Sequence, residues 1–239
     1  MSLRQPFDVL APHYWWLEKF TFGPMLQRCR TAHLSELGSC RNALILGDGD
    51  GRFLESFLAI YPQIRIDCLD ISLQMIKRAK KRLKKYQHRT HKLANNRPNA
   101  DVNFYQGDLR YFELPRSDYD LIITNFFLDC FPAGELPGII AKLARHTAKN
   151  ALWVVGDFAI PELKTPSGSF LQEFWIQQAI PLLLKSMYLF FRLTTSLRAS
   201  RLIDPAYELD ANGFRLIKES RFLGGFLSAR LWLKEYRSA

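Results

Sequence analysis

The stretch ALILGDGDGRFL, residues 43–54, decides how this chain folds. A short apolar run leads into three glycines at alternating positions, Gly47, Gly49 and Gly51, and a helix-like pattern follows. Glycine lets the backbone take positive φ and approach a ligand closely, and the first turn of a helix presents free N–H groups. The stretch therefore predicts a strand, a ligand-binding turn and a helix of a doubly wound sheet.

Further short apolar runs alternate with helical patterns, which favours an α/β fold with a mostly parallel sheet and helices on both faces. After the run at 42–47, the strand-like runs are IRIDCLD (64–70), VNFYQGD (102–108), YDLIITNF (119–126) and NALWVVGDF (150–158). Near the end, FRLIKESRF (214–222) and FLSARLWLKEY (226–236) flank two glycines, which predicts an antiparallel hairpin.

The length of 239 residues suits a single domain. We divide residues 1–239 into an N-terminal helical segment (1–40), a ligand-binding core (41–160), a helical cap with its connection (161–212) and the hairpin (213–239). Residues 170–202 are rich in large apolar side chains flanked by arginines. We expect helices there that cap a pocket at the carboxyl ends of the strands; contact with a membrane surface is the alternative.

Lysine and arginine number 33 against 23 aspartates and glutamates, which gives a net charge of +10. Much of the excess lies in an amphipathic helical pattern at 72–86, whose basic side is either a solvated face or a site for a polyanion. The polar stretch that follows, 87–100, predicts a surface loop.

The four cysteines stand far apart, so we expect neither disulfides nor a metal site, and we interpret the cysteines as small buried hydrophobes. No run is apolar enough to span a bilayer, and the first residues show no export signal. The expected location is the cytoplasm, with peripheral contact to a membrane as an alternative.

The turn excludes several ligands. Arg52 stands where the dinucleotide fingerprint G-x-G-x-x-G needs its last glycine, which disfavours NAD and FAD. No Gly-Lys-Ser or Gly-Lys-Thr follows, so a phosphate-binding P-loop is absent from the sequence. Asp48 and Asp50 would repel a phosphate but would tolerate a cationic or zwitterionic ligand. Asp70 ends the second strand, where a carboxylate can accept from ribose hydroxyls, and Asp108 follows the third strand, within reach of an adenine amino group.

At these residues the chain resembles class I S-adenosylmethionine-dependent methyltransferases, over residues 42 to about 160 and the final hairpin. LILGDGDG (44–51) is similar to the family's glycine-rich motif, LDIS (69–72) to its ribose-binding motif, QGDL (106–109) to its adenine-binding motif, and YDLIITNFFLD (119–129) to its fourth strand. The resemblance implies a seven-stranded sheet in the order 3-2-1-4-5-7-6. Within the family, both ends of the chain look most like small-molecule and lipoquinone-type enzymes.

The resemblance implies S-adenosylmethionine as the cofactor. The residues that it assigns to cofactor binding are Tyr14, Gly47, Asp48, Gly49, Gly51, Asp70, Ile71, Met75, Asp108, Leu109 and Asn125. One position departs from the pattern, because many members carry an acidic residue where this chain has Ile45. Asp48 would then have to hold the donor's amino group in its place.

Methyl transfer is an in-line displacement, so the enzyme mainly aligns donor and acceptor and excludes water. If the acceptor must lose a proton, a base is needed, and the candidates are His13, in the aromatic segment PHYWW, and Asp129, past the fourth strand. His13 is otherwise a surface histidine, and Tyr14 either closes on the donor or packs in the core.

Phe126, Phe127, Phe131 and the aromatic residues of 170–202 predict an apolar lining for the acceptor, although core packing also explains such residues. The favoured function is methyl transfer to a small, apolar or lipid-like acceptor. An RNA or protein methyltransferase that docks through the helix at 72–86, and a donor-binding domain without catalysis, are the alternatives. Nucleic acid is disfavoured because the fourth strand ends in TNFF, without the Asn/Asp-Pro-Pro-aromatic motif of enzymes that methylate base amino groups.

Overall fold

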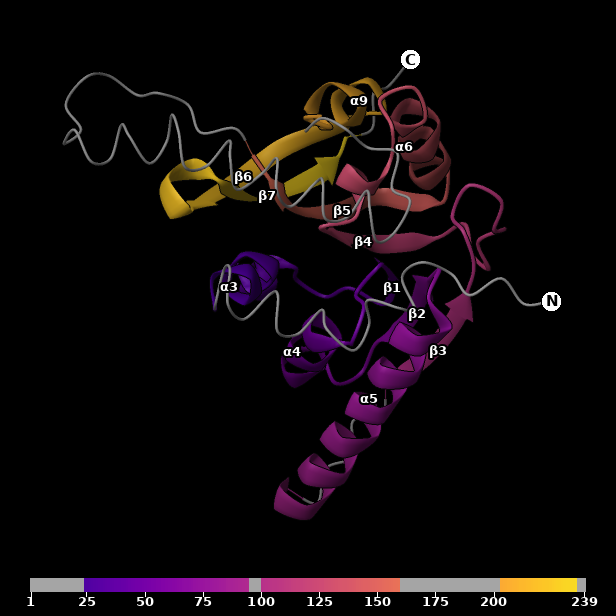
Figure 1. Cartoon of the computed structure of the whole chain (residues 1–239), viewed down its shortest axis with the longest axis vertical. Coiled ribbons are helices and arrows are strands. Elements are labelled where there is room, and N and C mark those ends of the chain that lie inside the picture. Colours follow the sequence, from indigo (N-terminus) through magenta and orange to yellow (C-terminus); the bar gives the residue numbers. More distant parts are fainter. Residues whose placement is uncertain (1–23, 95–99, 160–202, 236–239) are drawn as a thin grey trace.

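Seven strands form one sheet in the order β3-β2-β1-β4-β5-β7-β6 (Figure 1). The structure is a computed structural model that describes residues 24–94, 100–159 and 203–235. The strands are β1 (Asn42–Leu46), β2 (Arg65–Asp70), β3 (Asp101–Gln106), β4 (Tyr119–Asn125), β5 (Thr147–Phe158), β6 (Phe214–Phe222) and β7 (Leu227–Lys234). The observed order and the strand positions confirm the fold expected from the sequence.

The first five strands run parallel, so their carboxyl ends meet at one edge of the sheet. β7 pairs antiparallel with both β5 and β6. Its amino end therefore lies beside the carboxyl end of β5, where Phe158 pairs with Leu227. The predicted hairpin is present, and η4 (Leu223–Gly225) joins its strands with Gly224 and Gly225 at positive φ.

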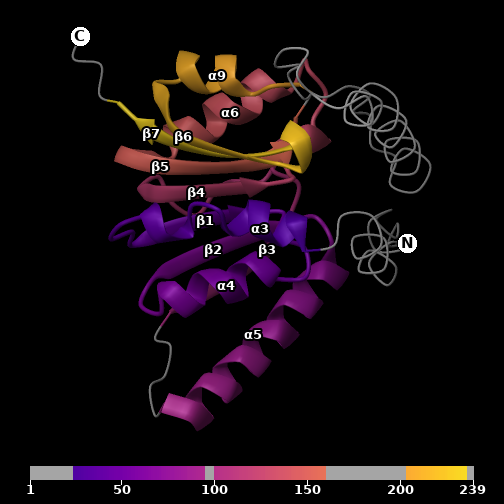
Figure 2. The same cartoon turned by 90° about the vertical axis from the view of Figure 1, so that its left-hand side faces the viewer.

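Alternating side chains of the strands build two core layers. On one side, Leu44 and Leu46 pack with α6 (Leu136–Arg145) and α9 (Ala206–Ala211). On the other, Ala43 and Ile45 pack with the buried face of α4 (Arg52–Ile60). The short helices α3 (Met25–Thr31) and η1 (Leu34–Glu36) precede β1, and η2 (Leu128–Cys130) follows β4. Figure 2 shows α6 and α9 on one side of the sheet and α4 on the other.

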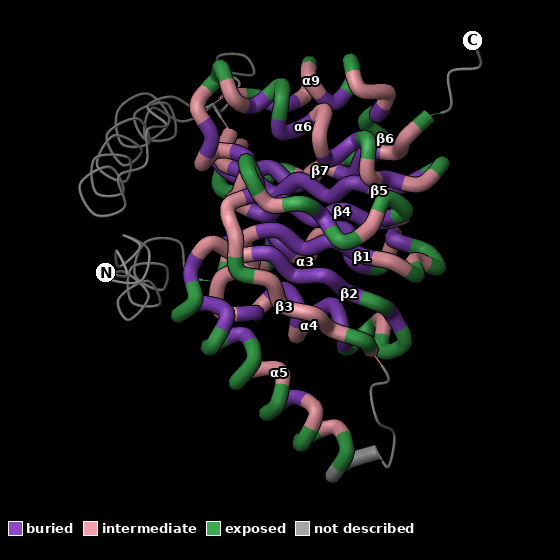
Figure 3. Tube along the Cα trace, turned by 90° about the vertical axis from the view of Figure 1, so that its right-hand side faces the viewer, coloured by how far each residue is buried: buried purple, intermediate pink, exposed green. Residues whose placement is uncertain are grey.

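The basic helix α5 (Leu73–Ala94) is longer than its sequence predicted. It continues through residue 94, so the expectation of a loop from residue 87 is wrong for that part. No glycine or proline interrupts the sequence before Pro98, and the Thr90 hydroxyl donates to the Tyr86 carbonyl at 3.0 Å. Figures 2 and 3 show that the second half of α5 projects beyond the sheet and is largely exposed.

Two predicted segments lie mostly outside the described residues. The N-terminal segment is described from residue 24 onward, and of the cap and connection only residues 203–212, which include α9, are described. Within the described part of the chain, no helix has both the length and the apolar character needed to cross a bilayer.

Candidate functional site

The turn after β1 is built from left-handed glycines. Gly47, Gly49 and Gly51 have φ of 65°, 62° and 82°. A Cβ on Gly47 would lie 2.5 Å from the Phe127 ring, and one on Gly51 would lie 3.0 Å from the Cα of Ala79 in α5. Side chains are thus excluded by backbone conformation and by close neighbours at both ends of the turn, as the predicted ligand-binding turn requires.

The Asp48 carboxylate holds the first turn of α4, which follows the glycine turn directly. Its two carboxylate oxygens accept from the backbone N–H groups of Phe53, at 3.1 Å, and Leu54, at 2.9 Å, so it caps α4. Burial nevertheless raises the pKa of Asp48 to about 7, against the opposing effect of these hydrogen bonds. Ile45, at the position of the missing acidic residue, is buried in the core. That Asp48 also holds the donor's amino group stays a prediction.

Asp70 stands at the carboxyl end of β2, directly beside the turn. Its Oδ2 accepts from the Gly49 N–H at 3.2 Å, and its Oδ1 accepts from the Ser72 N–H at 2.8 Å. These contacts fix the carboxylate at the strand end where the sequence predicted a ribose ligand. A carboxylate has about four lone-pair sites, so Asp70 can accept these two N–H groups and also accept hydrogen bonds from ribose hydroxyls.

Asp108 and Leu109 follow β3 at the same edge. The guanidinium of Arg110 donates to Asp108, with Nε 2.9 Å from Oδ1. Burial raises the pKa of Asp108, but the hydrogen bonds from Arg110 outweigh it, and the pKa is lowered overall. The Leu109 side chain is buried in the core. The adenine contact assigned to Asp108 stays a prediction.

Asn125 ends β4 with a buried side chain whose Oδ1 and Nδ2 find no hydrogen-bond partner among the described residues. Leaving a buried amide unsatisfied costs about 1–3 kcal/mol, which a bound ligand would recover. A Cβ on Gly156, in neighbouring β5, would lie 2.4 Å from Asn125 Oδ1. Gly156 therefore makes the room that Asn125 occupies.

Met75 and Ile71 lie near the turn and the end of β2. The Met75 sulfur is 3.9 Å from the position of a Cβ on Gly49, and Ile71 is partly buried just after β2. Together with Asp70 and Asn125, they surround the glycine turn at the carboxyl ends of β1, β2 and β4.

Asp129, the second predicted base, lies in η2 after β4. Burial raises the pKa of Asp129 to about 6, although the Cys130 thiol, 3.7 Å away, and a backbone N–H oppose this shift. His13 and Tyr14 lie outside the described residues.

Sequence reasoning missed Asp157, the penultimate residue of β5. Its side chain is 93% buried, with 7% relative exposure, at the same edge as Asp70 and Asn125. Burial, and then the charge of Asp129, raise the pKa of Asp157 well above its usual range. Asp70 was predicted because an acidic residue ends its strand. The same signal is present in the run VVGDF (154–158), so Asp157 could have been found in the same way.

Residues 44–152 match the model of a family described as a methyltransferase domain. A malonyl-[acyl-carrier protein] O-methyltransferase from Paenibacillus sp. (strain JDR-2) is 32% identical over 84 residues, which are 34% of this chain and 26% of that protein. The chain thus covers about a quarter of this curated relative.

Solved structures share the fold across most of the chain. An O-methyltransferase family protein from Burkholderia thailandensis has a TM-score of 0.65 at 16% identity, over 97% of this chain and 60% of its own. The N-methyltransferase NodS from Bradyrhizobium japonicum WM9, in complex with S-adenosyl-L-homocysteine, has a TM-score of 0.53 at 13% identity, over 88% and 84% of the two chains. The chain therefore shares the fold of these methyltransferase structures.

Proposed function

We propose that this chain, whose residues 44–152 match the model of a methyltransferase domain and whose sheet has the strand order shared by methyltransferase structures, transfers the methyl group of S-adenosylmethionine to a small acceptor. The observation that carries the proposal is the turn of three left-handed glycines, with Asp70 beside it and the unsatisfied Asn125 at the end of β4. Acidic and amide groups suit a nucleoside that carries ammonium and sulfonium charges.

Each residue of this arrangement has a task. Gly47, Gly49 and Gly51 let the backbone pass close to the donor, and Asp70 accepts from its ribose hydroxyls. Asn125 hydrogen-bonds the amino-acid end of the donor and so satisfies its own buried amide. When bound, S-adenosylmethionine supplies a methyl group on a sulfonium, which a lone pair of the acceptor displaces in line. The protein holds the two partners in that alignment and excludes water.

The acceptor's body is apolar in this proposal. Phe126 and Phe158 pack at 5.1 Å between ring centroids, and Phe158 and Phe226 at 5.5 Å, at the carboxyl end of β5. Core packing also accounts for these rings in part, because Phe126 and Phe158 pack against one core cluster and Phe127 and Phe131 belong to or pack against another. A lipid-like acceptor of the lipoquinone type, and His13 or Asp129 as its base, stay predictions.

The basic helix supports a second candidate, a macromolecular acceptor that docks on α5. Its exposed lysines are Lys77, Lys80, Lys81, Lys84 and Lys85. This candidate predicts that acceptor binding weakens steeply as salt is added, because released counterions drive binding to a polyanion. The third alternative, a domain that binds the donor without catalysis, predicts binding without turnover.

Titration calorimetry with S-adenosylhomocysteine tests the donor site. Asp70→Asn keeps the shape of the side chain but loses charge-assisted hydrogen bonds, each worth about 1.5–3 kcal/mol, so we expect Kd to rise roughly 10- to 150-fold. The matched control is Asp101→Asn, which removes an exposed carboxylate at the opposite end of the sheet, where Asp101 pairs with Arg65. Binding of NADH without binding of S-adenosylhomocysteine would show that the assignment is wrong.

A further inference from the structure

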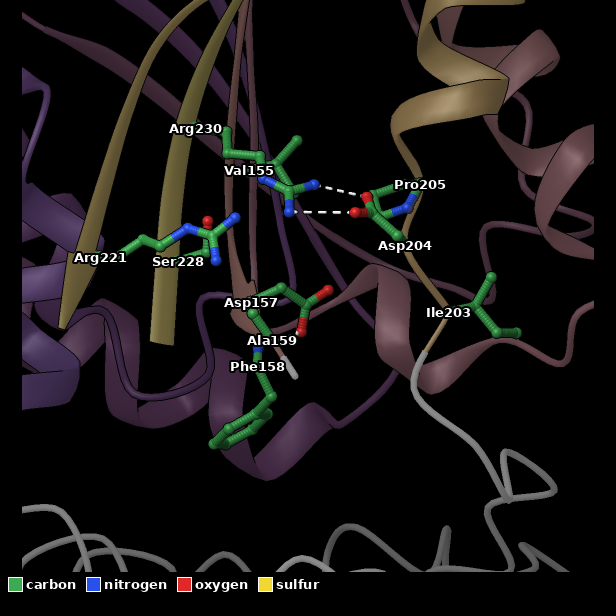
Figure 4. Close-up of a pocket in the computed structure, with 10 residues that line it drawn as sticks. All are labelled: Val155, Asp157, Phe158, Ala159, Ile203, Asp204, Pro205, Arg221, Ser228 and Arg230. Atoms are coloured by element: carbon green, nitrogen blue, oxygen red, sulfur yellow. Dashed lines mark hydrogen bonds and ion pairs between the residues drawn. The ribbon is translucent and has the colours of Figure 1, made fainter. Parts of the chain in front are cut away.

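A cavity of about 180 Å³ opens at the carboxyl end of β5 (Figure 4). Its walls come from β5, β6, β7 and the segment before α9, and include Asp157, Phe158, Ile203, Asp204, Arg221 and Arg230. Sites for complete drug-sized ligands span about 300–1,000 Å³, so this cavity suits the head group of a molecule whose body lies outside it.

The cations of the cavity are already neutralised. Arg230 Nη2 donates to Asp204 Oδ2 at 3.1 Å, and Arg230 Nε donates to Glu219 Oε1 at 3.0 Å. Arg221 Nε lies 3.2 Å from the same Glu219 oxygen. Figure 4 shows the Arg230–Asp204 pair on one side of the cavity. A negatively charged head group would have to compete with these carboxylates for both arginines.

Asp157 is the carboxyl group of the cavity with no cationic partner at ion-pair distance among the described residues. Its Oδ1 accepts from the Phe158 N–H at 2.8 Å, whereas Oδ2 accepts no hydrogen bond from a described residue. In Figure 4 the carboxyl group lies below the Arg230–Asp204 pair and points away from β5, toward the side of the cavity formed by Asp204 and Ile203. A buried carboxyl group with an unused oxygen is therefore aimed into a cavity large enough for a ligand group.

Beyond the effect of burial, the surroundings of Asp157 add more negative than positive charge, because Asp129 and Asp204 raise its pKa and Arg230 lowers it. The titratable or charged groups that face it or line the cavity are Cys29, Asp129, Cys130, Asp204, Arg221 and Arg230. Arg230, whose charge partly offsets these carboxylates, is already paired with Asp204 and Glu219, so no cation of the described residues forms an ion pair with the buried Asp157 or the half-buried Asp129. A ligand cation would supply a countercharge, a carboxylate would add a further negative charge, and an alcohol would leave the pair uncompensated.

We propose that this cavity receives a basic amine of the acceptor, and that Asp157 is the catalytic residue that takes its proton. This inference rests on the proposed methyl transfer and names its acceptor class. The ammonium donates to Asp157 Oδ2 and passes its proton to the carboxylate. The freed nitrogen lone pair then forms the N–C bond to the methyl group as the S–C bond breaks, and the thioether leaves with that electron pair. The raised pKa of Asp157 makes it a stronger base than an ordinary carboxylate.

Three acceptors with one aromatic body and different head groups test this inference: phenylpropylamine, phenylpropanol and phenylpropionic acid. Each is incubated at millimolar concentration with the full chain and S-adenosylmethionine labelled in the methyl group. We expect label in the amine and at most traces in the other two. Preferential methylation of the alcohol or the acid, or no methylation of the amine, overturns the inference.

Asp157→Asn separates this inference from the donor assignment. Loss of a general base typically costs about 10²–10⁴ in rate, so we expect a loss of at least about 100-fold in methyl transfer to the amine. The Kd of S-adenosylhomocysteine should stay within about twofold, which also shows that the variant is folded. Asp210→Asn, on the exposed part of α9, is the matched control. If Asp157→Asn is as active as the control, Asp157 is not the base; if the parent chain binds no S-adenosylhomocysteine, the proposed function itself fails.

Discussion

At the scale of single residues, the site depends on carboxyl groups in different surroundings. Asp48 and Asp70 accept backbone N–H groups and hold the glycine turn in place. Asp129 and Asp157 lie further along the same edge, where burial raises the pKa of both and the charge of Asp129 raises that of Asp157 further. Similar side chains thus serve as structural acceptors at one end of the site and as a proton-binding pair at the other.

The coupling of this pair predicts the effect of Asp129→Asn on the pH profile. The proposed base works when Asp157 is ionised, so the rate rises with pH through the pKa of Asp157. Removing the negative charge of Asp129 lowers that pKa, and the rising limb of kcat/KM for the amine should move to lower pH. The measurement is methyl transfer from pH 5 to 9, with Asp210→Asn as control. A limb that stays in place, or moves to higher pH, contradicts the coupling.

At the scale of elements, the decisive contact joins the glycine turn to α5. Ala79 approaches Gly51 closely, and Arg82 donates to the Asp50 carbonyl at 2.8 Å and to its carboxylate at 2.8 Å. The sequence predicted the turn and the basic helix separately. It did not predict that they touch, because the contact depends on how two helices pack on one face of the sheet.

This contact can be measured by comparing two glycines. Gly51→Ala and Gly38→Ala both place a side chain at positive φ, but Gly38 has nothing within 4 Å of the new Cβ. The left-handed backbone costs about 1–2 kcal/mol in either variant, and overpacking against Ala79 adds about 1–3 kcal/mol in Gly51→Ala. Urea unfolding should therefore show a larger loss of stability for Gly51→Ala. Equal losses would mean that α5 moves away without cost.

At the scale of the whole molecule, the strands and the final hairpin could be predicted because hydrophobic periodicity and turn residues are local signals. The order of the strands was implied by the resemblance to class I methyltransferases. The site could be predicted from the sequence only in part. Asp70 was placed at a strand end by its position, whereas the isolation of Asn125 depends on Gly156 in another strand, and the cavity around Asp157 on residues from three further segments. Such groupings arise from tertiary packing, which one strand's pattern does not reveal.

The charge of the whole molecule supplies a test between a small and a macromolecular acceptor. Reversing Lys81, Lys84 and Lys85 to glutamate changes exposed positions on α5, away from the cavity. We expect methyl transfer to phenylpropylamine to stay within about twofold and to change little between low and physiological salt, where surface charges become screened. A macromolecular acceptor whose methylation collapses in this variant and falls steeply with salt would favour the second candidate.

The antiparallel course of β7 also orders events during synthesis. β7 lies between β5 and β6, so β6 joins the sheet only through a strand that is translated after it. The donor turn and Asp70 belong to the strands made first, whereas Arg230 belongs to the strand that closes the cavity. The cavity at the end of β5 is therefore complete only once the last strand of the sheet has been synthesised.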